Sequence, residues 1–105
     1  MNLNNDITKV MNIDTINDGK QVVASNTKFK TICFIFDEDK GLPNHTHSGY
    51  ASVLVYEGEV DMEFVNGEKY KLNKGDFMPF DARTEHNVIA RCRSKVLVTI
   101  SEKIS

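Results

Sequence analysis

Three histidines are the side chains of this sequence best suited to chemistry. His45 and His47 stand one residue apart in "NHTH", just before the apolar run "YASVLVY", and His86 follows the later turn "DARTE". Alternate residues of a β-strand point to one face, so His45 and His47 would aim two imidazoles at the same point. If the strand that His86 opens lies beside theirs, three nitrogens converge on one side of an ion. Imidazole nitrogen suits Zn, Fe, Ni and Cu ions.

The alternative is that these histidines simply face water. A pair separated by one residue is weak evidence by itself, because loop histidines commonly lie at the surface. The third histidine, His86, favours the metal hypothesis because it stands at the start of a predicted strand. Neutral imidazole is available at pH 7, since an unperturbed histidine titrates near ~6.5.

The segments that must position the histidines have the periodicity of strands. Apolar and β-branched residues fill 29–36 and 53–56, and apolar and charged residues alternate through 60–65. Turn signals rich in Gly, Pro, Asn and Asp separate these segments. Many short strands between such turns indicate an all-β sandwich or barrel. No segment makes a convincing helix, since the best candidate, 6–16, is rich in β-branched residues and Asn.

One hairpin can be predicted in register. A two-residue loop at "NG" would set apolar residues opposite lysines. A three-residue loop over 65–67 instead pairs Met62 with Tyr70 and Val60 with Leu72. That loop requires its glycine to take the left-handed conformation, as in a type I turn with a bulge.

Size, charge and composition exclude several classes of protein. The 105 residues suit a single domain, 1–105, and the formal net charge of −2, without a long Lys/Arg cluster, argues against nucleic acid as a partner. No apolar stretch approaches the ~20 residues that a membrane helix needs. The polar N-terminus lacks a signal sequence, so we expect a cytoplasmic protein. There, Cys33 and Cys92 are expected to be buried free thiols rather than a disulfide.

"GLPNHTHSGYASVLVYEG" (41–58) and "GDFMPFDARTEH" (75–86), with a hairpin between them, resemble the two sequence motifs of the cupins. The histidine positions of the first motif and the ends of both motifs are filled here by His45, His47, Gly58, Gly75 and His86. Over its whole length the chain resembles small single-domain bacterial cupins. The resemblance implies a double-stranded β-helix, or jelly-roll barrel, with the site inside its wider mouth, and a homodimer. We expect residues 1–18 to form an N-terminal strand or arm and 19–105 the barrel.

The sequence departs from the cupin motifs at four positions. The glutamate that serves as fourth ligand in the family falls at Ala51, which cannot bind metal. Asp81 and Arg83 stand where the second motif has proline and glycine. Asp39 stands where the first motif has its opening glycine, and Gly41 comes two residues late.

Three histidines without the carboxylate remain a known type of cupin site. The resemblance therefore implies that His45, His47 and His86 bind one divalent transition ion, Fe, Zn, Ni or Mn. Tyr50, Ala51 and Phe80 are the expected lining of a pocket for a small-molecule ligand. Three functions stay open: a metal-dependent oxygenase or isomerase acting on a small organic substrate, a non-catalytic binding or sensing module, and a metal-free dimeric cupin.

Overall fold

The computed structural model describes residues 6–102 and confirms the prediction of an all-β chain. Within these residues the chain forms nine strands and one 3-10 turn, and no helix has the length and apolar character of a membrane span. In chain order the elements are η1 (Ile13–Thr15), β1 (Lys20–Ser25), β2 (Phe29–Phe36), β3 (Gly41–His45), β4 (Tyr50–Glu57), β5 (Glu59–Phe64), β6 (Lys69–Asn73), β7 (Phe77–Asp81), β8 (His86–Ala90) and β9 (Ser94–Ser101).

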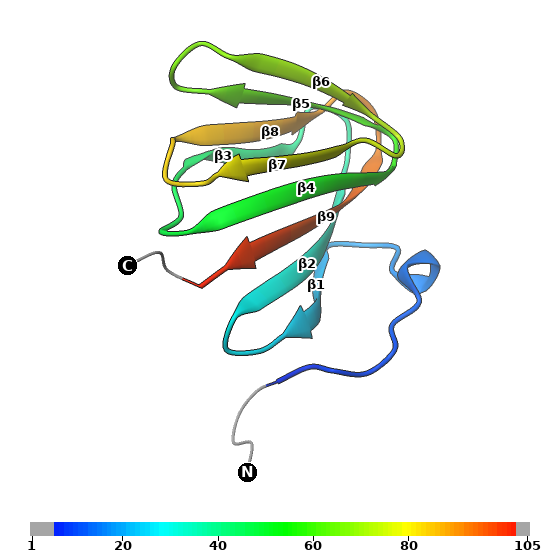
Figure 1. Cartoon of the computed structure of the whole chain (residues 1–105). Helices are drawn as coiled ribbons and strands as arrows, with labels where there is room; N and C mark the ends of the chain where they lie inside the picture. Colours follow the sequence, from blue (N-terminus) through cyan, green and yellow to red (C-terminus); the bar gives the residue numbers. More distant parts are fainter. Residues whose placement is uncertain (1–5, 103–105) are drawn as a thin grey trace.

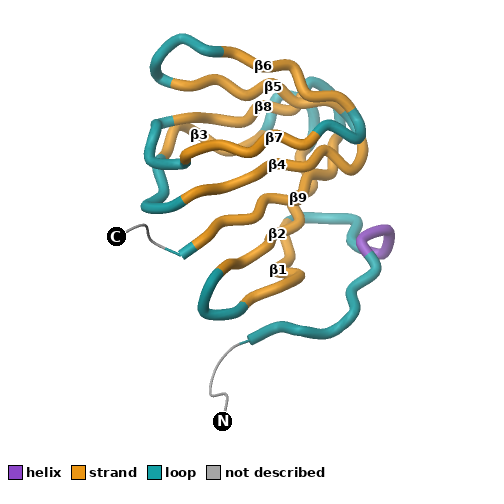
Figure 2. Tube along the Cα trace, viewed as in Figure 1, coloured by secondary structure: helices purple, strands orange, loops and turns teal. Residues whose placement is uncertain are grey.

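Two antiparallel sheets form the jelly roll (Figures 1 and 2). One has five strands in the order β1-β2-β9-β4-β7, and the other has four in the order β3-β8-β5-β6. Neighbours in a sheet are mostly distant in sequence, which is how the two motifs come to lie together. The first motif spans β3 and β4, and the second spans β7 and β8, so each motif contributes one strand to each sheet.

The core lies between the two sheets and follows the strand alternation. Val53 and Val55 of β4 face inward with Val60 and Met62 of β5, and all four are 1% exposed or less. The alternation places every second side chain of a strand on this inner face. Burial of these branched and flexible apolar chains is the main stabilising term of the fold.

The predicted hairpin has the register expected for a three-residue loop. Met62 pairs with Tyr70 and Val60 pairs with Leu72 across β5 and β6. Gly67 has a φ of 97°, in the left-handed region that the loop requires. The hairpin therefore places the apolar residues of β5 in the core and its acidic residues outside.

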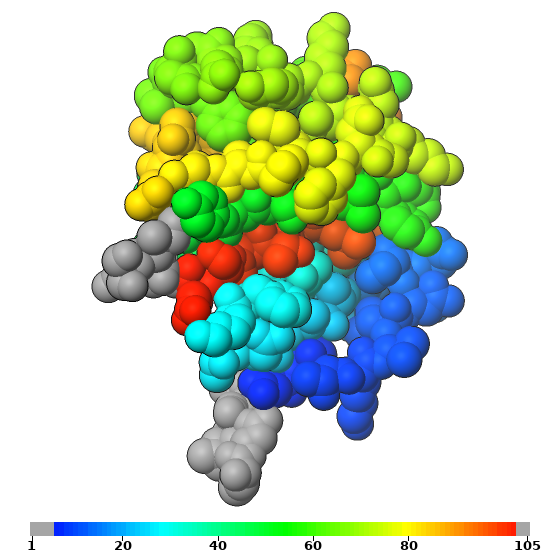
Figure 3. Space-filling view, in the orientation of Figure 1, coloured from blue at the N-terminus to red at the C-terminus, as the bar shows by residue number. Residues whose placement is uncertain are grey.

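The segment before β1 packs against its own chain. Ile7 forms a bridge with Ser25, Ile16 is 5% exposed, and Lys95 Nζ donates a hydrogen bond of 2.9 Å to the carbonyl of Ile13. The segment wraps around one end of the five-stranded sheet (Figures 1 and 3). The predicted arm, 1–18, begins before the described residues.

Candidate functional site

The strands of His45 and His86 are neighbours, as the metal hypothesis requires. β3 pairs with β8, and His45 stands directly opposite His86 in that pairing. The centroids of the two imidazole rings are 4.4 Å apart. The last residue of β3 and the first residue of β8 thus form a histidine pair at one end of these two neighbouring strands.

Backbone carbonyls fix the orientation and the tautomer of both rings. His45 Nδ1 lies 2.7 Å from the carbonyl oxygen of Pro43, and His86 Nδ1 lies 2.7 Å from that of Thr84. A carbonyl oxygen only accepts, so in each ring the proton is assigned to Nδ1. Each Nε2 then keeps its lone pair. Histidine ligands of metals are held in this way, through a hydrogen bond from the second ring nitrogen.

His86 is buried in an aromatic environment. It is 4% exposed, and its ring centroid lies 4.7 Å from that of Phe80 and 5.9 Å from that of Phe64. Burial lowers the pKa of His86 below its usual value, the hydrogen bond to Thr84 opposes this, and the nearby His45 and His47 lower it further. The ring is therefore neutral at pH 7 and available as a lone-pair donor.

His47 does not continue the strand, so the expectation that strand alternation would align it with His45 is wrong. β3 ends at His45 after a register shift, and the backbone N–H of His47 donates to the carbonyl of Ala82 at 2.9 Å. Its Nε2 donates to the carbonyl of Ser101 at 2.9 Å. The ring of His47 is thus held by the end of β9, with Nδ1 as its free nitrogen.

The donor chemistry of the histidine pair fits a transition ion, while the full ligand set is not assembled. Across residues 6–102, no three His, Cys, Asp or Glu side chains are arranged to hold a metal. His45 and His86 each present an unprotonated Nε2, which is the form a metal requires.

The three residues predicted to line a pocket have different surroundings. Ala51 is 9% exposed and stands opposite Phe80 of β7 in the sheet. Phe80 therefore shares the inner face with Ala51, and its ring reaches across to His86. Tyr50 is 54% exposed and lies outside the barrel, at its rim.

The space beside Ala51 is filled mainly by aromatic rings. Phe80 packs nearly perpendicular to His86 and to Phe64, with interplanar angles of 71° and 73°. A hollow of about 250 Å³ includes His47 among its lining residues, together with residues of β2 and the end of β9. A ligand that reached the buried face of His86 would have to displace the Phe80 ring that packs on it.

A charged group occupies the rim at the positions where the chain departs from the second motif. Arg83 donates to both carboxylate oxygens of Asp81, from Nε at 2.9 Å and from the terminal nitrogen at 2.6 Å. Its guanidinium also lies over the Tyr50 ring, 5.9 Å from the centroid. The side-chain hydrogen bonds from Arg83 lower the pKa of Asp81 to about 2. The rim thus carries a fixed ion pair beside the loop that ends in His86.

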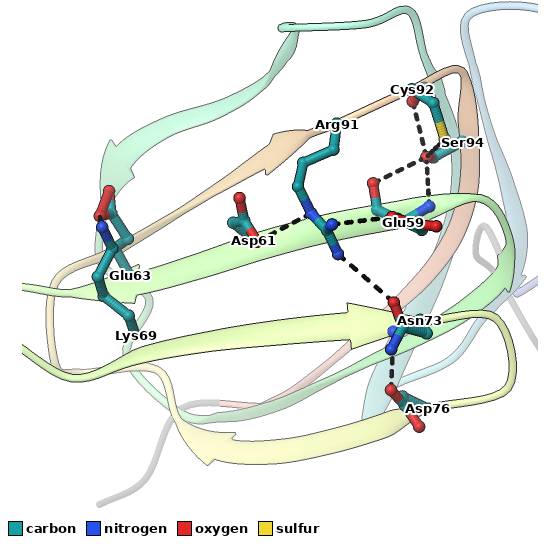
Figure 4. Close-up of polar contacts among 9 residues, drawn as sticks. All are labelled: Glu59, Asp61, Glu63, Lys69, Asn73, Asp76, Arg91, Cys92 and Ser94. Atoms are coloured by element: carbon teal, nitrogen blue, oxygen red, sulfur yellow. Dashed lines mark hydrogen bonds and ion pairs between the residues drawn. The ribbon is translucent and has the colours of Figure 1, made fainter.

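The outer face of the four-stranded sheet carries a separate polar network (Figure 4). Arg91 forms ion pairs of 2.8 Å with Glu59 and 3.1 Å with Asp61, and donates to Asn73 at 3.4 Å. The contact with Asp61 lacks hydrogen-bond geometry, so it is electrostatic only. The network ties the end of β8 to β5 and β6. Because its ion pairs are partly exposed, each contributes little to the free energy of unfolding.

The two cysteines lie in different environments. Both are free thiols, which confirms the prediction of no disulfide between them. Cys33 is fully buried, and this burial raises the pKa of its thiol, opposed by the charge of Lys95. Cys92 is exposed, so the prediction that it would be buried is wrong. It lies in the short turn between β8 and β9, where no second layer covers it.

Sequence reasoning missed the groups that orient the histidines. The carbonyls of Pro43, Thr84 and Ser101 carry no side-chain signature, and only the fold reveals their contacts. The proximity of His45 to His86 could be predicted from the sequence, because each histidine stands at the end of a predicted strand. The contact of the Phe80 ring with His86 joins the two sheets, and no local pattern in the sequence predicts it.

Comparison with known proteins identifies the family. The cupin domain family matches residues 34–100 of the chain. A cupin superfamily protein from Desulfitobacterium hafniense superimposes with a TM-score of 0.80 at 16% identity, covering 92% of this chain and 95% of that one. No curated protein matches the sequence.

Two further solved structures are 25% identical to the chain. An RmlC-like cupin from Desulfovibrio desulfuricans has a TM-score of 0.74 and covers 99% of this chain and 100% of that one. KdgF from Halomonas sp. has a TM-score of 0.70, with coverages of 82% and 79%. The family match spans most of the chain, including both histidine segments and the strands that carry them, so this protein belongs to the cupin domain family.

Proposed function

We propose that this chain is a small metal-dependent cupin that binds one divalent transition ion through His45, His47 and His86. The observation that carries the proposal is the pair of opposed imidazoles, each with its Nδ1 proton on a backbone carbonyl and its Nε2 free. A surface histidine pair has no need of two such matched hydrogen bonds. The pair is therefore preorganised for a ligand that accepts two nitrogen lone pairs.

The residues around the histidine pair would complete the ligand set and control the access of a substrate. Turning the His47 ring from the carbonyl of Ser101 would add the third nitrogen, and Ala51 supplies no carboxylate as a fourth ligand. The bound ion would supply Lewis-acid or redox chemistry for a small organic substrate, in the class of an oxygenase or an isomerase. Phe80 keeps water from the buried side of His86 until a substrate displaces its ring.

A second candidate is a metal-free binding module. Two observations favour it: the hydrogen bond of His47 to Ser101 and the packing of Phe80 on His86. Both contacts would have to be broken for His47 to become a ligand and for a substrate to reach His86. In this case the barrel mouth would be a small apolar ligand site with a histidine edge.

Metal content separates the two candidates. The protein is loaded in turn with Fe(II), Zn(II), Ni(II) and Mn(II), desalted and analysed for bound metal. We expect about one ion per chain for at least one of these metals. His45→Ala and His86→Ala should abolish retention, and His47→Ala should weaken binding by about tenfold or more through loss of one ligand.

Matched controls come from the outer side of the same strands. Asn44 is the neighbour of His45 in sequence and Asn87 is the neighbour of His86, so both lie on the opposite face of the sheet. A hydrogen bond of 2.9 Å links the two asparagines. Asn44→Ala and Asn87→Ala should leave metal retention unchanged. If no metal remains with the wild-type protein, the metal-free module replaces the enzyme. A protein that retains iron is then tested for O₂ uptake with small acids, thiols and diketones.

We also propose a cytoplasmic homodimer. Two free thiols, one of them exposed, are typical of a reducing compartment. β1 lies at the edge of the five-stranded sheet, where Ile7 bridges to it at Ser25, and a sheet edge favours pairing with another chain. Light scattering that gives 11.9 kDa at micromolar concentration would contradict the dimer.

A further inference from the structure

A second hollow lies at the opposite end of β9 from His47. It has a volume of about 230 Å³ and lies between the N-terminal segment and the strands β2, β4 and β9. It is lined by Asp14, Ile16, Asn17, Ile35, Glu57, Arg93, Ser94 and Lys95. Neither the metal hypothesis nor the packing of the barrel core uses this cavity.

The cavity contains a buried ammonium group. Lys95 is only 7% exposed because the N-terminal segment covers it. Its Nζ donates to the carbonyl of Ile13 at 2.9 Å and lies 5.5 Å from the centroid of the Tyr56 ring. An ammonium group has three N–H donors, so one hydrogen bond leaves two donors for other acceptors. Burial of a charge is costly when its hydrogen-bonding capacity is not met.

No carboxylate neutralises this ammonium directly. Glu57 stands opposite Lys95 in the pairing of β4 with β9, yet within residues 6–102 Lys95 has no ion pair at 4 Å or less. The side chain of Lys95 is directed to Ile13 instead. Cation and carboxylate thus lie at the same cavity without contact between them.

A second charge of each sign adjoins the same space. Arg93, another lining residue, donates to Asp37 and to the carbonyl of Asn17. Asp14 accepts the Tyr56 hydroxyl on Oδ1 at 2.5 Å, and this bond leaves Oδ2 for a further donor. The cavity therefore presents two cationic and two anionic side chains: Lys95 and Arg93, and Asp14 and Glu57.

We propose that this cavity binds a small zwitterion, an amino acid whose carboxylate pairs with Lys95 and whose ammonium pairs with Glu57 and Asp14. Because Arg93 is already paired with Asp37 and the carbonyl of Asn17, a simple anion would meet Lys95 alone and would be repelled by the two carboxylates. A simple amine would leave the two spare donors of Lys95 unmet. A zwitterion satisfies both groups, since charge-assisted hydrogen bonds of opposite polarity form at its two ends. The volume accommodates a molecule of a few heavy atoms.

The test compares zwitterions with analogues that carry one of their two charges. Glycine, β-alanine and 4-aminobutyrate are titrated into the full chain, and butyrate and butylamine serve as single-charge analogues. Amide NMR shifts are followed at Lys95 and Glu57. We expect saturable shifts at both residues with at least one zwitterion, and binding about tenfold or more weaker for the single-charge molecules.

Variants assign the two charges. Lys95→Met and Glu57→Gln should each weaken binding of that zwitterion by about tenfold or more. Lys69→Met and Glu63→Gln alter an exposed Lys–Glu pair on the other sheet (Figure 4) and should leave binding unchanged. Lys95→Met could loosen the N-terminal segment, because Lys95 bonds to Ile13. Glu57→Gln still decides in that case, because Glu57 forms no ion pair with Lys95 and its replacement leaves the bond to Ile13 intact. Saturable binding of butyrate equal to that of the zwitterion, or no saturable shift with any of the three, overturns the proposal.

Discussion

His45 and His86 face each other across two antiparallel strands, and each ring is held through Nδ1 by a carbonyl two residues earlier in the chain. The two contacts are equivalent, although His45 ends β3 and His86 begins β8. The consequence is a pair of free Nε2 atoms that needs no side-chain partner to set its tautomer. The surroundings differ, because His86 is buried and His45 is exposed.

The burial of His86 predicts a stability that depends on pH in the metal-free protein. Its folded pKa is lowered, mainly by burial, so the unfolded chain takes up a proton first as the pH falls below about 6.5. The free energy of unfolding should therefore be greatest above that pH and decrease as the pH falls toward the folded pKa. Urea denaturation at several pH values measures this.

The matched variant is His86→Gln, which cannot titrate. Its stability should be lower than that of the wild type at pH 7, and it should decline less between pH 7 and pH 5. An equal decline in both proteins would show that His86 does not carry the effect.

The ion pair at the rim predicts that the low pKa of Asp81 depends on Arg83. Arg83 holds the pKa of Asp81 at about 2, through its side-chain hydrogen bonds first and its backbone N–H second. Because the folded pKa lies below the unfolded value, the contribution of this pair is present above pH ~3.9 and is lost as the pH falls through about 2. Arg83→Gln removes the guanidinium but keeps the backbone N–H donor, so carboxyl ¹³C NMR should find the Asp81 pKa raised from about 2 toward its ordinary value of 3.8. A value that stays near 2 would contradict the assignment to Arg83.

The parts of the fold that were predicted from sequence depend on local patterns. The alternation in β5 and the glycine at position 67 determine the hairpin register without any distant contact. β1 was not predicted as a strand, and of β3 only the end that carries His45 was. Residues of β1 are at most half-buried and its register shifts after Val22, and β3 is short and contains Pro43. Such strands have no clear two-residue period to detect.

The candidate site was predictable only where strand ends determine it. The pairing of His45 with His86 follows from two strand boundaries, and it is confirmed. The direction of the His47 ring depends on the carbonyl of Ser101, 54 positions later in the chain. The burial of Lys95 likewise depends on a contact with Ile13, 82 positions earlier. Strand alternation places Lys95 outside the core, and only the covering N-terminal segment removes it from water.

Close approach of β3 to β8 predicts that Gly41 cannot be replaced. A Cβ atom at Gly41 would lie 1.8 Å from the carbonyl oxygen of Val88, a backbone atom that cannot turn aside. Gly41→Ala should lower the free energy of unfolding by about 3 kcal/mol, through separation of the two strands. The same separation should disturb the pairing of His45 with His86, which the ring ¹⁵N shifts would report.

Gly67→Ala is the matched comparison for this variant. Gly67 has a φ of 97°, and a Cβ atom added there would have no neighbouring atom within 4 Å, so the alanine costs only backbone strain, about 1 kcal/mol. Urea denaturation of both variants should rank Gly41→Ala as the more destabilised. Equal losses would mean that β3 can move away from β8 at little cost.

Asp39 has a left-handed backbone conformation that favours glycine, and this predicts a gain from placing glycine there. Its φ is 69°, the one positive value among non-glycine residues of the described chain. The turn is fixed, because the N–H of Asp39 donates to the carbonyl of Ala90 and the N–H of Ala90 donates to that of Lys40, both at 2.8 Å. The chain therefore cannot relieve the strain by relaxing the turn.

Glycine has no Cβ to strain in this conformation, but it loses more entropy on folding, so the two terms partly offset. Asp39→Gly should raise the free energy of unfolding by about 0.5 kcal/mol, and Asp39→Val should lower it by about 2 kcal/mol, since a β-branched residue is the least tolerant of positive φ. Thermal and urea denaturation measure both. Neither change touches a histidine, so metal retention should equal that of the wild type. If Asp39→Val is as stable as the wild type, the turn before β3 is not held in the left-handed conformation, and the position does not replace the glycine of the motif.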